Sequence, residues 1–504
     1  MKVTFISPSM YVAAPGIRMI SSCLKRAGHE TKIIFIKTEL GKRCDEKTAD
    51  LVVKLAAESD LIGISLTTNF FEISAQITQK IKKELKTPVI WGGIHPTVSP
   101  EECLEYADFV CRGEGEEAIV ELVERIEKNK NDYSIKNIYF KDNAGNIIRN
   151  LLRPLIQDLD SLPFLDYDLK NQYIIVDGNS YRMDDPAVIQ FWDGNDYNGH
   201  TYTTLITRGC PLSCAYCCNN TLNNLYHGQK IFRVRSVDNV IEEIKRVKKN
   251  LLFVECIFFN DDHFLGLSVE YLKEFSEKYK KYIGLPMIIV GVHPSAVDEK
   301  KMDYITKAGD IKFLAMGIQA ASERIKKIFK RNYPNSDVIK AASIINKFKD
   351  KIGIICFEVI LDNPWETEKD IIETLMLLSR LPAPYSMNIF SLTLYPGTEL
   401  YELAKKENLI KNERGEIYQK DFVITRQNTY LNKLFFLVRE YGLSDKPISP
   451  ILMIVLTNYF LRKVKISQSI YYILYSYVKG GIVFKLSFPI RIIAKKIYRY
   501  FRKK

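Results

Sequence analysis

Three cysteines, Cys210, Cys214 and Cys217, form a C-x3-C-x2-C pattern within the segment TRGCPLSCAYCCNN. This segment directly follows YTTLIT, whose β-branched and aromatic residues predict a strand. Iron–sulfur clusters of the four-iron type are usually held by four cysteine thiolates. Three thiolates in one loop leave one iron open to an outside ligand. We therefore predict that these three cysteines hold a [4Fe-4S] cluster.

The same sulfur donors also allow a second interpretation, a Cys3His zinc site completed by His227. Zinc loops favour C-x2-C pairs and usually contain a second pair, so the iron–sulfur interpretation is favoured. Cys218 lies one residue beyond the spacing of the loop, and we expect it to be a packed thiol. The chain has ten cysteines, and we expect no disulfide framework in a chain of 504 residues with no secretory signal.

Alternating strands and helices position the cysteine loop. Residues 199–410 contain six apolar runs, each of which predicts a strand: YTTLIT, LFVECIFF, PMIIVG, IKFLAMG, GIICFEVIL and YSMNIFSLTL. Six such units, with helices between them, are enough for a partial barrel whose functional groups lie at the carboxyl ends of the strands. The cysteine loop follows the first predicted strand, so we expect it at that end of the barrel.

A similar alternation fills residues 1–135, a separate domain. Its predicted strands are KVTFIS, TKIIFI, LIGISL, PVIWG and FVCR, and its predicted helices span residues 17–27, 46–58, 71–85 and 116–128. This order implies a parallel sheet covered on both faces, with ligands bound beyond the carboxyl ends of its strands. The segments there are SPSMYVAAPG, SLTTNF, GGIHPT and RGEGEE. Their small and hydroxyl residues suit close backbone approach to a ligand, and the alternative is that they are only tight turns.

The remaining two regions are less regular. Residues 136–198 lack clear periodicity, and we predict a linker there. Residues 411–504 are predicted to form a basic helical region. Residues 431–504 hold 15 Lys and Arg against 2 Asp and Glu, and the net charge of the whole chain is +12. The excess of positive charge in the chain therefore comes from this tail. The body is thus nearly balanced in charge, and nothing in it indicates nucleic-acid binding.

The basic tail interleaves charged residues with apolar and aromatic ones, as in SIYYILYSYV and IRIIAKKIYRYFRKK. An amphipathic helix on an anionic membrane surface has this composition. The alternative is that helices pack on the barrel and expose basic faces. We do not expect an arm that binds nucleic acid, because phosphate binding needs fewer apolar residues than this tail contains. No uncharged apolar run reaches 18 residues, and MKVTFISPSM lacks the core of a signal peptide. We expect a cytoplasmic protein, peripheral at the membrane if the first interpretation of the tail holds.

The cysteine pattern C-x3-C-x-Tyr-C after the first strand of a β/α repeat resembles the radical S-adenosylmethionine (SAM) superfamily. The resemblance implies that SAM binds the open iron through its amino and carboxylate groups. Reduction by one electron, supplied by an external donor of the flavodoxin or ferredoxin type, then cleaves SAM to methionine and a 5′-deoxyadenosyl radical. Tyr216 matches the aromatic residue that packs near the adenine of SAM.

Further motifs over roughly residues 1–410 resemble the radical SAM enzymes that carry a cobalamin-binding domain. They include ISLTTN, GGIHPTVSPEE, GIQAASERIKKIFKR and LYPGTELYELAKKENLI. This resemblance implies a Rossmann-like (flavodoxin-like) cobalamin-binding domain ahead of a TIM-type partial (β/α)6 radical SAM barrel. The residues that match cobalamin-pocket positions are Ser65, Thr67, Gly92, Gly93, His95 and Glu114. The residues that match SAM-contact positions are Asp261, Gln319 and Ser322.

The chain also departs from the family pattern. Gln319 stands where glutamate is common, and Asn363 and Trp365 replace smaller residues. The segment from Asp261 to Gly266 fits D-x-H-x-x-G, a pattern whose histidine ligates cobalt, but it follows a barrel strand instead of the first front strand. We therefore expect cobalamin without a protein histidine on cobalt. For His95 two interpretations stay open: a residue of the ligand pocket, or a satisfied structural histidine.

The resemblance implies a cobalamin-dependent radical SAM methyltransferase that modifies an unactivated carbon of a small-molecule or lipid-like substrate. A cyclisation or rearrangement that uses the same cofactors without net methyl transfer is the second hypothesis. The third is a radical SAM enzyme whose front domain is a structural module without cobalamin. The substrate itself is not encoded in any motif that we can identify.

Overall fold

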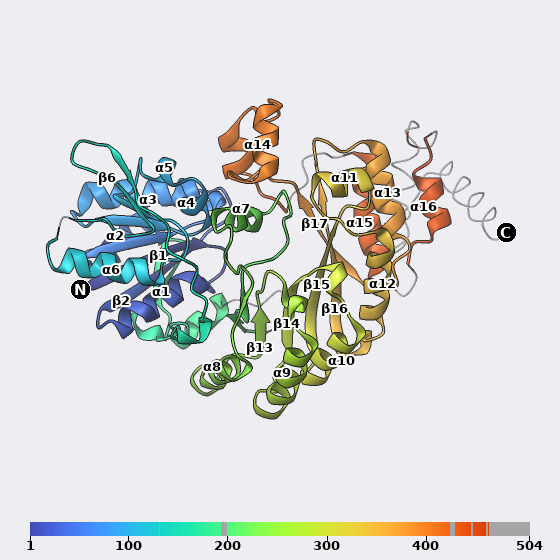
Figure 1. The fold of residues 1–504 in the computed structure, drawn as a ribbon, viewed down its shortest axis with the longest axis horizontal. Coiled ribbons are helices and arrows are strands. Elements are labelled where there is room, and N and C mark those ends of the chain that lie inside the picture. Colours follow the sequence, from blue (N-terminus) through green and yellow to red (C-terminus); the bar gives the residue numbers. More distant parts are fainter. Residues whose placement is uncertain (131, 193–198, 424–428, 445–446, 460–461, 463–504) are drawn as a thin grey trace.

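The computed structural model describes residues 1–130, 132–192, 199–423, 429–444, 447–459 and 462. Two α/β bodies lie side by side, and the chain passes from one to the other near residue 200 (Figure 1). The carboxyl ends of several strands in each body face the space between them. The fold class predicted from the sequence, an amino-terminal Rossmann-like domain followed by a partial barrel, is confirmed.

The first body contains a nine-stranded sheet in the order β7-β6-β5-β4-β3-β1-β2-β8-β9. Six neighbouring strands, from β5 to β8 in this order, are parallel, while β6, β7 and β9 pair antiparallel at the two edges. The strands are β1 (Lys2–Ser9), β2 (Glu30–Lys37), β3 (Leu61–Ser65), β4 (Val89–Gly92), β5 (Phe109–Cys111), β6 (Ile138–Lys141), β7 (Ile147–Arg149), β8 (Gln172–Val176) and β9 (Asn179–Arg182).

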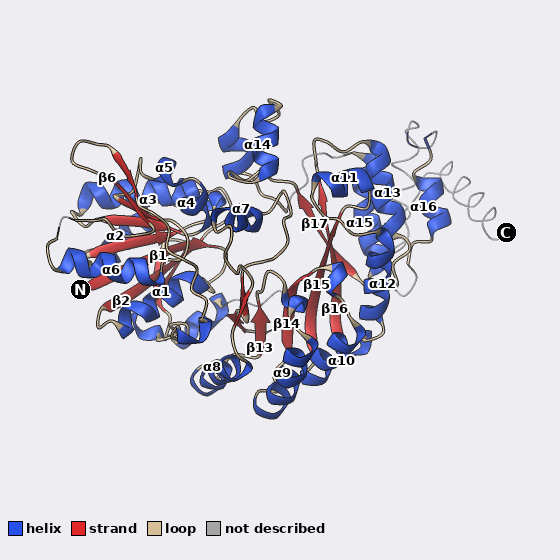
Figure 2. Cartoon of the chain, viewed as in Figure 1, coloured by secondary structure: helices blue, strands red, loops and turns tan. Residues whose placement is uncertain are grey.

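Helices cover both faces of this sheet, as Figure 2 shows. They are α1 (Pro15–Arg26), α2 (Glu46–Ala56), α3 (Phe71–Glu84), α4 (Ile94–Val98), α5 (Pro100–Cys103) and α6 (Glu116–Glu127). Successive strand residues point to opposite faces. Ile6 packs in the cluster under α2 and α3, whereas Phe5 packs in the cluster under α1 and α6. Apolar residues on both faces explain why these strands read as nearly continuous hydrophobic runs.

Residues 136–198 differ from the predicted linker, because they add β6 to β9 to the edges of the first sheet. β8 pairs in parallel with β2, from Ile33 opposite Gln172 to Ile36 opposite Ile175. These strands have three to five residues and mix polar with apolar side chains. Short edge strands of this kind give no clear period in the sequence, so pairing with the adjacent strand decides their conformation.

The second body is a six-stranded parallel sheet whose order follows the sequence, β10-β13-β14-β15-β16-β17. The strands are β10 (Thr201–Thr204), β13 (Cys256–Phe259), β14 (Met287–Val292), β15 (Ile311–Gln319), β16 (Ile352–Leu361) and β17 (Ser386–Ser391). Helices on its outer side bury the largest core cluster of the described chain. They are α8 (Val237–Asn250), α9 (Val269–Tyr282), α10 (Glu299–Ala308), α12 (Asn335–Asn346) and α13 (Glu368–Leu378). The six strands match the predicted partial barrel.

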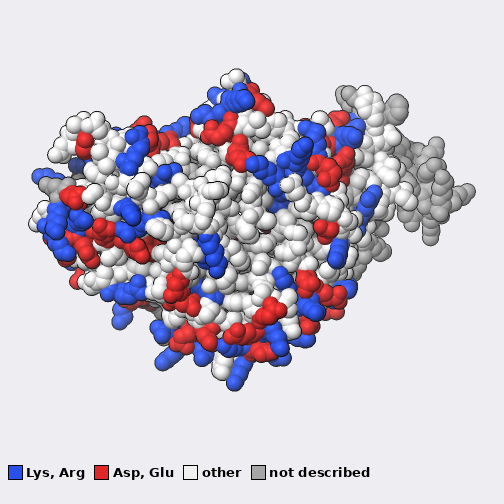
Figure 3. Space-filling model, in the orientation of Figure 1, with Lys and Arg blue, Asp and Glu red and all other residues white. Residues whose placement is uncertain are grey.

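Shorter elements lie at the carboxyl ends of the barrel strands. The two-stranded ribbon of β11 (Thr207–Arg208) and β12 (Arg233–Val234) surrounds the cysteine loop, and α7 (Cys218–Leu225) follows the loop. α11 (Glu323–Ile328) follows β15. On the face in Figure 3, acidic and basic side chains alternate over α8, α9 and α10, so neither positive nor negative charge predominates on this surface.

The segment after β17 contacts both bodies. α14 (Glu399–Lys406) and the helical turn Arg414–Tyr418 lead back to the first body. There the Asn69 amide donates to the carbonyl oxygens of Ile417 and Lys420, at 3.3 and 2.9 Å. The predicted boundary near residue 410 thus falls inside a segment that joins the two bodies.

The described part of the carboxyl-terminal region is helical, as α15 (Tyr430–Gly442) and α16 (Pro450–Leu456). Leu434, Leu437 and Val438 of α15 are buried against the barrel core, so this part packs on the protein. Residues 463–504, which carry most of the predicted basic tail, lie outside the described residues. No helix in the described ranges combines the length and apolar character needed to cross a membrane.

Candidate active site

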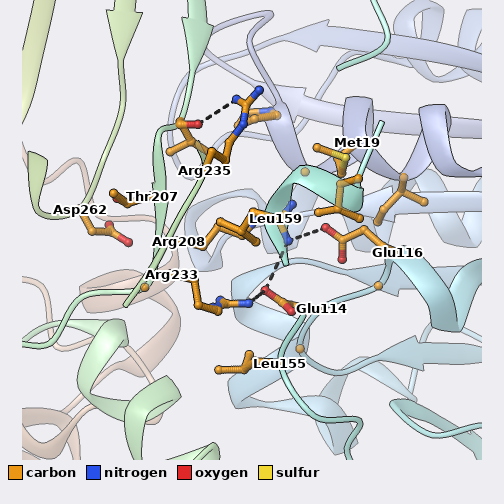
Figure 4. Close-up of a pocket in the computed structure, with 18 of the residues that line it drawn as sticks. Met19, Glu114, Glu116, Leu155, Leu159, Thr207, Arg208, Arg233, Arg235 and Asp262 are labelled. Atoms are coloured by element: carbon orange, nitrogen blue, oxygen red, sulfur yellow. Dashed lines mark hydrogen bonds and ion pairs between the residues drawn. The ribbon is translucent and has the colours of Figure 1, made fainter. Parts of the chain in front are cut away.

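A cavity of about 390 Å³ lies between the two bodies, at the carboxyl ends of their strands. The first body contributes Met19, Ser65 and Gly93 to its wall, and the second contributes Arg208 and Asp262. Figure 4 shows these two walls facing each other, with leucines of the connecting segment between them. The site is therefore shared by two domains, and neither domain encloses it alone.

The cysteine loop begins at this cavity, immediately after β11. Cys210 and Cys214 are buried, and Cys217 is half-buried at the start of α7. Gly209, which precedes the loop, has a φ of +80°, and a Cβ there would lie 2.4 Å from the Ile231 carbonyl oxygen. Glycine is therefore required for the turn that brings the loop to this place.

The three thiols influence one another. Burial raises the pKa of Cys210 to about 12, and nearby Cys217 and Cys214 raise it further. A hydrogen bond from Cys218 lowers the pKa of Cys217. Within the described residues, no three Cys, His, Asp or Glu side chains converge on one point that could hold a single metal ion. Ligands of a four-iron cluster each bind a different iron, so they must surround the group instead.

Arg331, which follows α11, lies against the cysteine loop. Its Nη1 is 3.8 Å from Cys214 Sγ and 3.1 Å from the Tyr216 hydroxyl. Its Nη2 donates to the Gly317 carbonyl oxygen of β15 at 2.5 Å. The guanidinium thus connects Cys214 and Tyr216 to the centre of the barrel sheet.

At the ends of β15 and β16, the predicted SAM residue Gln319 and the departing residue Asn363 each have a polar atom with no protein partner. Gln319 has a φ of +67°, and its buried Oε1 accepts no hydrogen bond within the described chain. The buried Nδ2 of Asn363 likewise donates to no described group. Buried polar groups without a protein partner are rare in native proteins, and a bound water, ion or ligand can satisfy them. The residues present at this end of the barrel therefore fit a polar ligand such as SAM.

Two other predicted SAM residues are already engaged. The Ser322 hydroxyl donates to Asp370. The Asp261 carboxylate accepts hydrogen bonds from the backbone N–H and the hydroxyl of Thr207, both at 2.6 Å. Burial raises the pKa of Asp261 to about 6, although these hydrogen bonds lower it. Asp261 therefore holds the strand before the cysteine loop, while its neighbour Asp262 faces the cavity.

The predicted cobalamin residues Ser65, Gly92 and Gly93 lie at the ends of β3 and β4. They line a narrow hollow of about 50 Å³ that enters the first sheet, with Gly63 at its inner part. A Cβ on Gly63 would lie 2.7 Å from the Phe5 ring, and a Cβ on Gly93 would lie 2.7 Å from the Leu66 carbonyl oxygen. Glycines keep this hollow open, so the residues present fit a group that inserts into the sheet edge.

Two further predicted cobalamin residues lie elsewhere. Thr67 is exposed and is not among the described residues that line the cavity. His95 is completely buried, with Nδ1 3.1 Å from the Thr68 hydroxyl and Nε2 3.4 Å from the Glu102 carboxylate. Its ring also contacts the edge of Tyr418, from the segment that joins the two bodies. His95 lies in the core and does not line the cavity, which favours a structural residue, although its Nε2 makes no hydrogen bond within the described chain.

Glu114 is at the cavity, where it pairs with two arginines of the second body. Its Oε1 lies 2.7 Å from Arg233 and 3.3 Å from Arg208, and its Oε2 accepts the Ile156 N–H at 2.8 Å. Glu116 adds a pair with Arg208 at 2.6 Å (Figure 4). These ion pairs fix the front domain to the ribbon that carries the cysteine loop.

Sequence reasoning missed four of these residues: Asp262, Arg331, Arg208 and Arg233. Asp262 lies next to a predicted residue, but which of two adjacent aspartates faces the cavity depends on the local backbone. Arg208 precedes the cysteine loop by two residues, and that proximity was the available signal. Arg331 is more than one hundred residues from Cys214, so no local pattern reveals their contact.

Comparisons with known proteins agree with this architecture. The family model described as B12 binding domain matches residues 1–123, and the model described as Radical SAM superfamily matches residues 204–378. The uncharacterized methyltransferase PH0819 of Pyrococcus horikoshii is 29% identical over 361 residues, which is 70% of this chain and 71% of that protein.

An anaerobic magnesium-protoporphyrin IX monomethyl ester cyclase of Cereibacter sphaeroides is 24% identical, over 74% of this chain and 59% of the cyclase. Among solved structures, the cobalamin-dependent S-adenosylmethionine radical enzyme OxsB, with aqua-cobalamin and S-adenosylmethionine bound, has the same fold. Its TM-score is 0.64 at 14% identity, and the match covers 95% of this chain and 70% of OxsB. With its two matched domains and its cysteine loop at their junction, the chain belongs to the radical SAM enzymes that carry a B12-binding domain.

Proposed function

We propose that this protein is a cobalamin-dependent radical SAM methyltransferase that acts on an unactivated carbon of a small-molecule or lipid-like substrate. The observation that carries the proposal is the shared cavity. The cysteine loop of the barrel and the glycine-lined hollow of the front domain open toward the same space between the two bodies. The similarity to the methyltransferase PH0819 over most of both chains supports methyl transfer.

Three groups of side chains would hold the cofactors. Cys210, Cys214 and Cys217 would bind the iron–sulfur cluster. Gln319 and Asn363, with their unpartnered polar atoms, would bind SAM. The hollow lined by Ser65, Gly92 and Gly93 would receive part of cobalamin. When bound, these groups would supply the 5′-deoxyadenosyl radical and a cobalt-bound methyl group.

The protein's own contribution is to position the reactants and to exclude water. Leu155, Leu159 and Leu162 of the connecting segment form an apolar wall of the cavity. The arginines of the opposite wall are paired with carboxylates, as Arg235 is with Glu243. An apolar cavity with paired charges protects a reactive radical from side reactions with solvent. Reactants held in fixed geometry react far faster than when they meet by diffusion.

The proposal is tested with anaerobically reconstituted protein, a low-potential reductant and SAM labelled in its methyl group. Methyl transfer places the label in the product and forms 5′-deoxyadenosine. The first measurement needs no substrate, because a competent cluster cleaves SAM slowly on its own. Reconstituted protein that contains no iron, or that contains iron and never cleaves SAM, would refute the proposal.

A second candidate function is a cyclisation or rearrangement without net methyl transfer. The similarity to the magnesium-protoporphyrin monomethyl ester cyclase favours it, although the match covers only 59% of that enzyme. The labelled-SAM assay separates the two functions. Deoxyadenosine formed together with an unlabelled, altered product supports cyclisation, whereas a labelled product supports methyl transfer.

The third hypothesis, a front domain without cobalamin, predicts that the protein's own side chains fill the edge of the first sheet. The hollow kept open by Gly63 and Gly93 argues for a bound group instead. Purification of the chain with cobalamin under anaerobic conditions, followed by an absorption spectrum, tests this point. Protein that leaves the column without corrin absorbance would favour the structural module.

Two partners complete the proposal. An electron donor of the flavodoxin or ferredoxin type would reduce the cluster. The carboxyl-terminal region would contact an anionic membrane surface, because α16 exposes Ile451 and Ile454 beside a strongly basic sequence. Flotation of the full chain with vesicles of anionic and of neutral phospholipid tests the membrane contact. The proposal requires binding to the anionic vesicles alone.

A further inference from the structure

Arg331 carries a buried positive charge that no described carboxylate balances directly. Its side chain is among the buried residues of the barrel, 6% exposed. No described carboxylate oxygen lies within 4.0 Å of its guanidinium nitrogens. Among the described residues, its side chain bonds only to neutral groups and a thiol: the Gly317 carbonyl, the hydroxyls of Tyr216 and Tyr333, and Cys214 Sγ. A buried charge without a counter-charge costs several kcal/mol, and a neighbouring anion, such as the thiolate of a cluster ligand, would offset that cost.

The carboxylate that faces Arg331 from β16 does not supply this anion. Glu358 lies close enough for Arg331 to lower its pKa, but burial raises that pKa more strongly. Its carboxylate accepts a hydrogen bond from the Asn388 amide at 3.4 Å. Within the described residues Glu358 makes no ion pair with Arg331, so it is not a direct counter-charge to the guanidinium.

Two arginines near the cysteine loop, Arg233 and Arg235, differ from Arg331 in this respect. Arg233 pairs with Glu114 at 2.7 Å, and Arg235 pairs with Glu243 at 2.5 Å. In the same segment as Arg331, the buried Lys326 pairs with Glu323 at 2.5 Å and donates to the Tyr333 carbonyl oxygen. Each of these cations has its own carboxylate within the protein, whereas Arg331 has a cysteine of the proposed cluster.

From this contrast we infer that Arg331 is a positioning residue that sets the reduction potential of the cluster bound by Cys210, Cys214 and Cys217. The inference rests on the proposed function, because it requires that cluster. A [4Fe-4S] core of charge +2 with three thiolates carries a total charge of −1. One electron from a low-potential donor reduces the core to +1 and makes the total −2, with no bond formed or broken.

A fixed cation beside the sulfur stabilises the reduced state more than the oxidised state, because the reduced state carries the larger negative charge. Hydrogen bonds to the sulfurs act in the same direction, and both are recognised determinants of cluster potentials. The guanidinium Nη1 provides both, since it is charged and lies 3.8 Å from Cys214 Sγ. Removal of Arg331 therefore makes the cluster harder to reduce.

The hydrogen bonds of Arg331 keep this charge in place. Its guanidinium group bridges the cysteine loop and the Gly317 carbonyl oxygen. The Tyr333 hydroxyl accepts a hydrogen bond from Arg331 Nε at 3.0 Å and donates one to the Ile318 carbonyl oxygen at 3.0 Å. Lysine at this position would retain the charge but could not make the same set of bonds. Charge and hydrogen-bond geometry can therefore be separated by two substitutions.

The test is a redox titration of the reconstituted full chain, without SAM, followed by electron paramagnetic resonance of the reduced cluster. Three variants are compared with the wild type at equal iron content: Arg331→Gln, Arg331→Lys and Lys326→Met. The Arg331→Gln variant is expected to have a ratio of reduced to oxidised cluster at least tenfold lower at a given potential, which corresponds to about 59 mV for a one-electron couple. Arg331→Lys and Lys326→Met are expected to stay within about threefold of the wild type, given that a tenfold change is 59 mV.

An unchanged ratio in Arg331→Gln would overturn the inference, and so would an equal loss in Lys326→Met, because the effect would then belong to any buried cation. If Arg331→Gln holds no iron, the Arg331→Lys variant decides the question. A cluster in Arg331→Lys with nearly the wild-type ratio of reduced to oxidised form supports the role of the charge. Loss of iron in both variants overturns the inference. Absence of a cluster signal in the wild type is a different outcome, since it refutes the proposed function itself.

Discussion

Glu114 of the front domain and Arg233 of the barrel domain form an ion pair across the cavity, with 2.7 Å between Oε1 and Nη1. Arg233 is almost completely buried, and Glu114 also contacts Arg208 and the Ile156 N–H. The pair connects the domain that carries the glycine-lined hollow to the ribbon that precedes the cysteine loop. Glu114 thus contributes, together with Glu116, to the relative position of the two proposed cofactor sites.

Replacement of Glu114 by Gln is predicted to lower the free energy of unfolding by about 3 kcal/mol, because it leaves the buried Arg233 guanidinium without its carboxylate, while Arg208 keeps its pair with Glu116. Urea or guanidinium unfolding, followed by circular dichroism, measures the change. The control is Glu117→Gln, three residues further along at the start of α6, whose carboxylate is largely exposed and pairs with Arg153. An exposed pair contributes roughly 0–1 kcal/mol. Equal losses in the two variants would contradict the prediction.

Substitution of Gly93 by Ala is predicted to weaken cobalamin binding at least tenfold. The new Cβ would lie 2.7 Å from the Leu66 carbonyl oxygen, and the φ of +102° suits glycine. The neighbouring substitution Gly92→Ala places its Cβ no closer than 3.8 Å to a neighbouring atom, the Cβ of Cys111, so its binding should change by less than threefold. Equilibrium titration followed by the corrin absorbance measures both. Similar affinities for the two variants would remove the hollow from the binding site.

Alanine at Cys210, Cys214 or Cys217 is predicted to abolish SAM cleavage and to reduce the iron content after reconstitution. Each removes one of three thiolates that surround the proposed cluster, and a two-thiolate loop leaves too few ligands. Cys218→Ala is the matched control in the same loop, and it should retain iron and SAM cleavage. Iron analysis and the yield of 5′-deoxyadenosine are the measurements. Cleavage retained in any of the first three variants would contradict the cluster assignment.

The two adjacent aspartates are predicted to separate stability from activity. Asp261→Asn disrupts hydrogen bonds to Thr207, so the free energy of unfolding should fall by about 1–3 kcal/mol. Asp262 faces the cavity, so Asp262→Asn should change stability by less than about 0.5 kcal/mol and should lower SAM cleavage. Thermal unfolding and the deoxyadenosine assay distinguish them. The reverse pattern would show that the roles of the two residues are exchanged.

His293 is predicted to make the protein less stable in acid. Burial, assisted by Arg331 and His263, lowers the pKa of His293 from 6.5 to about 3. Below pH 6.5 the unfolded chain binds a proton at this residue that the folded chain does not bind. The stability is therefore complete above pH 6.5 and is lost toward pH 3, by about 1.4 kcal/mol for each pH unit.

Unfolding by denaturant between pH 7.5 and pH 4.5 checks this dependence. His293→Gln should flatten the acid slope, whereas His227→Gln, at an exposed histidine, should keep it. The flattening must appear in the difference between the two variants, because other groups also titrate in this range. An identical slope in both variants would exclude His293 as its source.

The sequence by itself determined the cysteine loop, the two alternations of strand and helix, and the end of each sheet at which the site lies. All three follow from short-range patterns, since spacing within a loop and the period of apolar residues are set by the local backbone. The six barrel strands and the parallel front strands form where these patterns predict them. Ser65, Gly92, Gly93 and Glu114 are at the cavity or its hollow for the same reason.

Only the tertiary structure decided what each polar side chain does at those strand ends. Asp261 and Asp262 are equivalent in the sequence, yet one binds the backbone of Thr207 and the other faces the cavity. His95 is buried by Tyr418, more than three hundred residues away, and Arg331 reaches Cys214 from a different strand. Contacts between distant segments depend on how two domains pack against each other, and no local period encodes that packing.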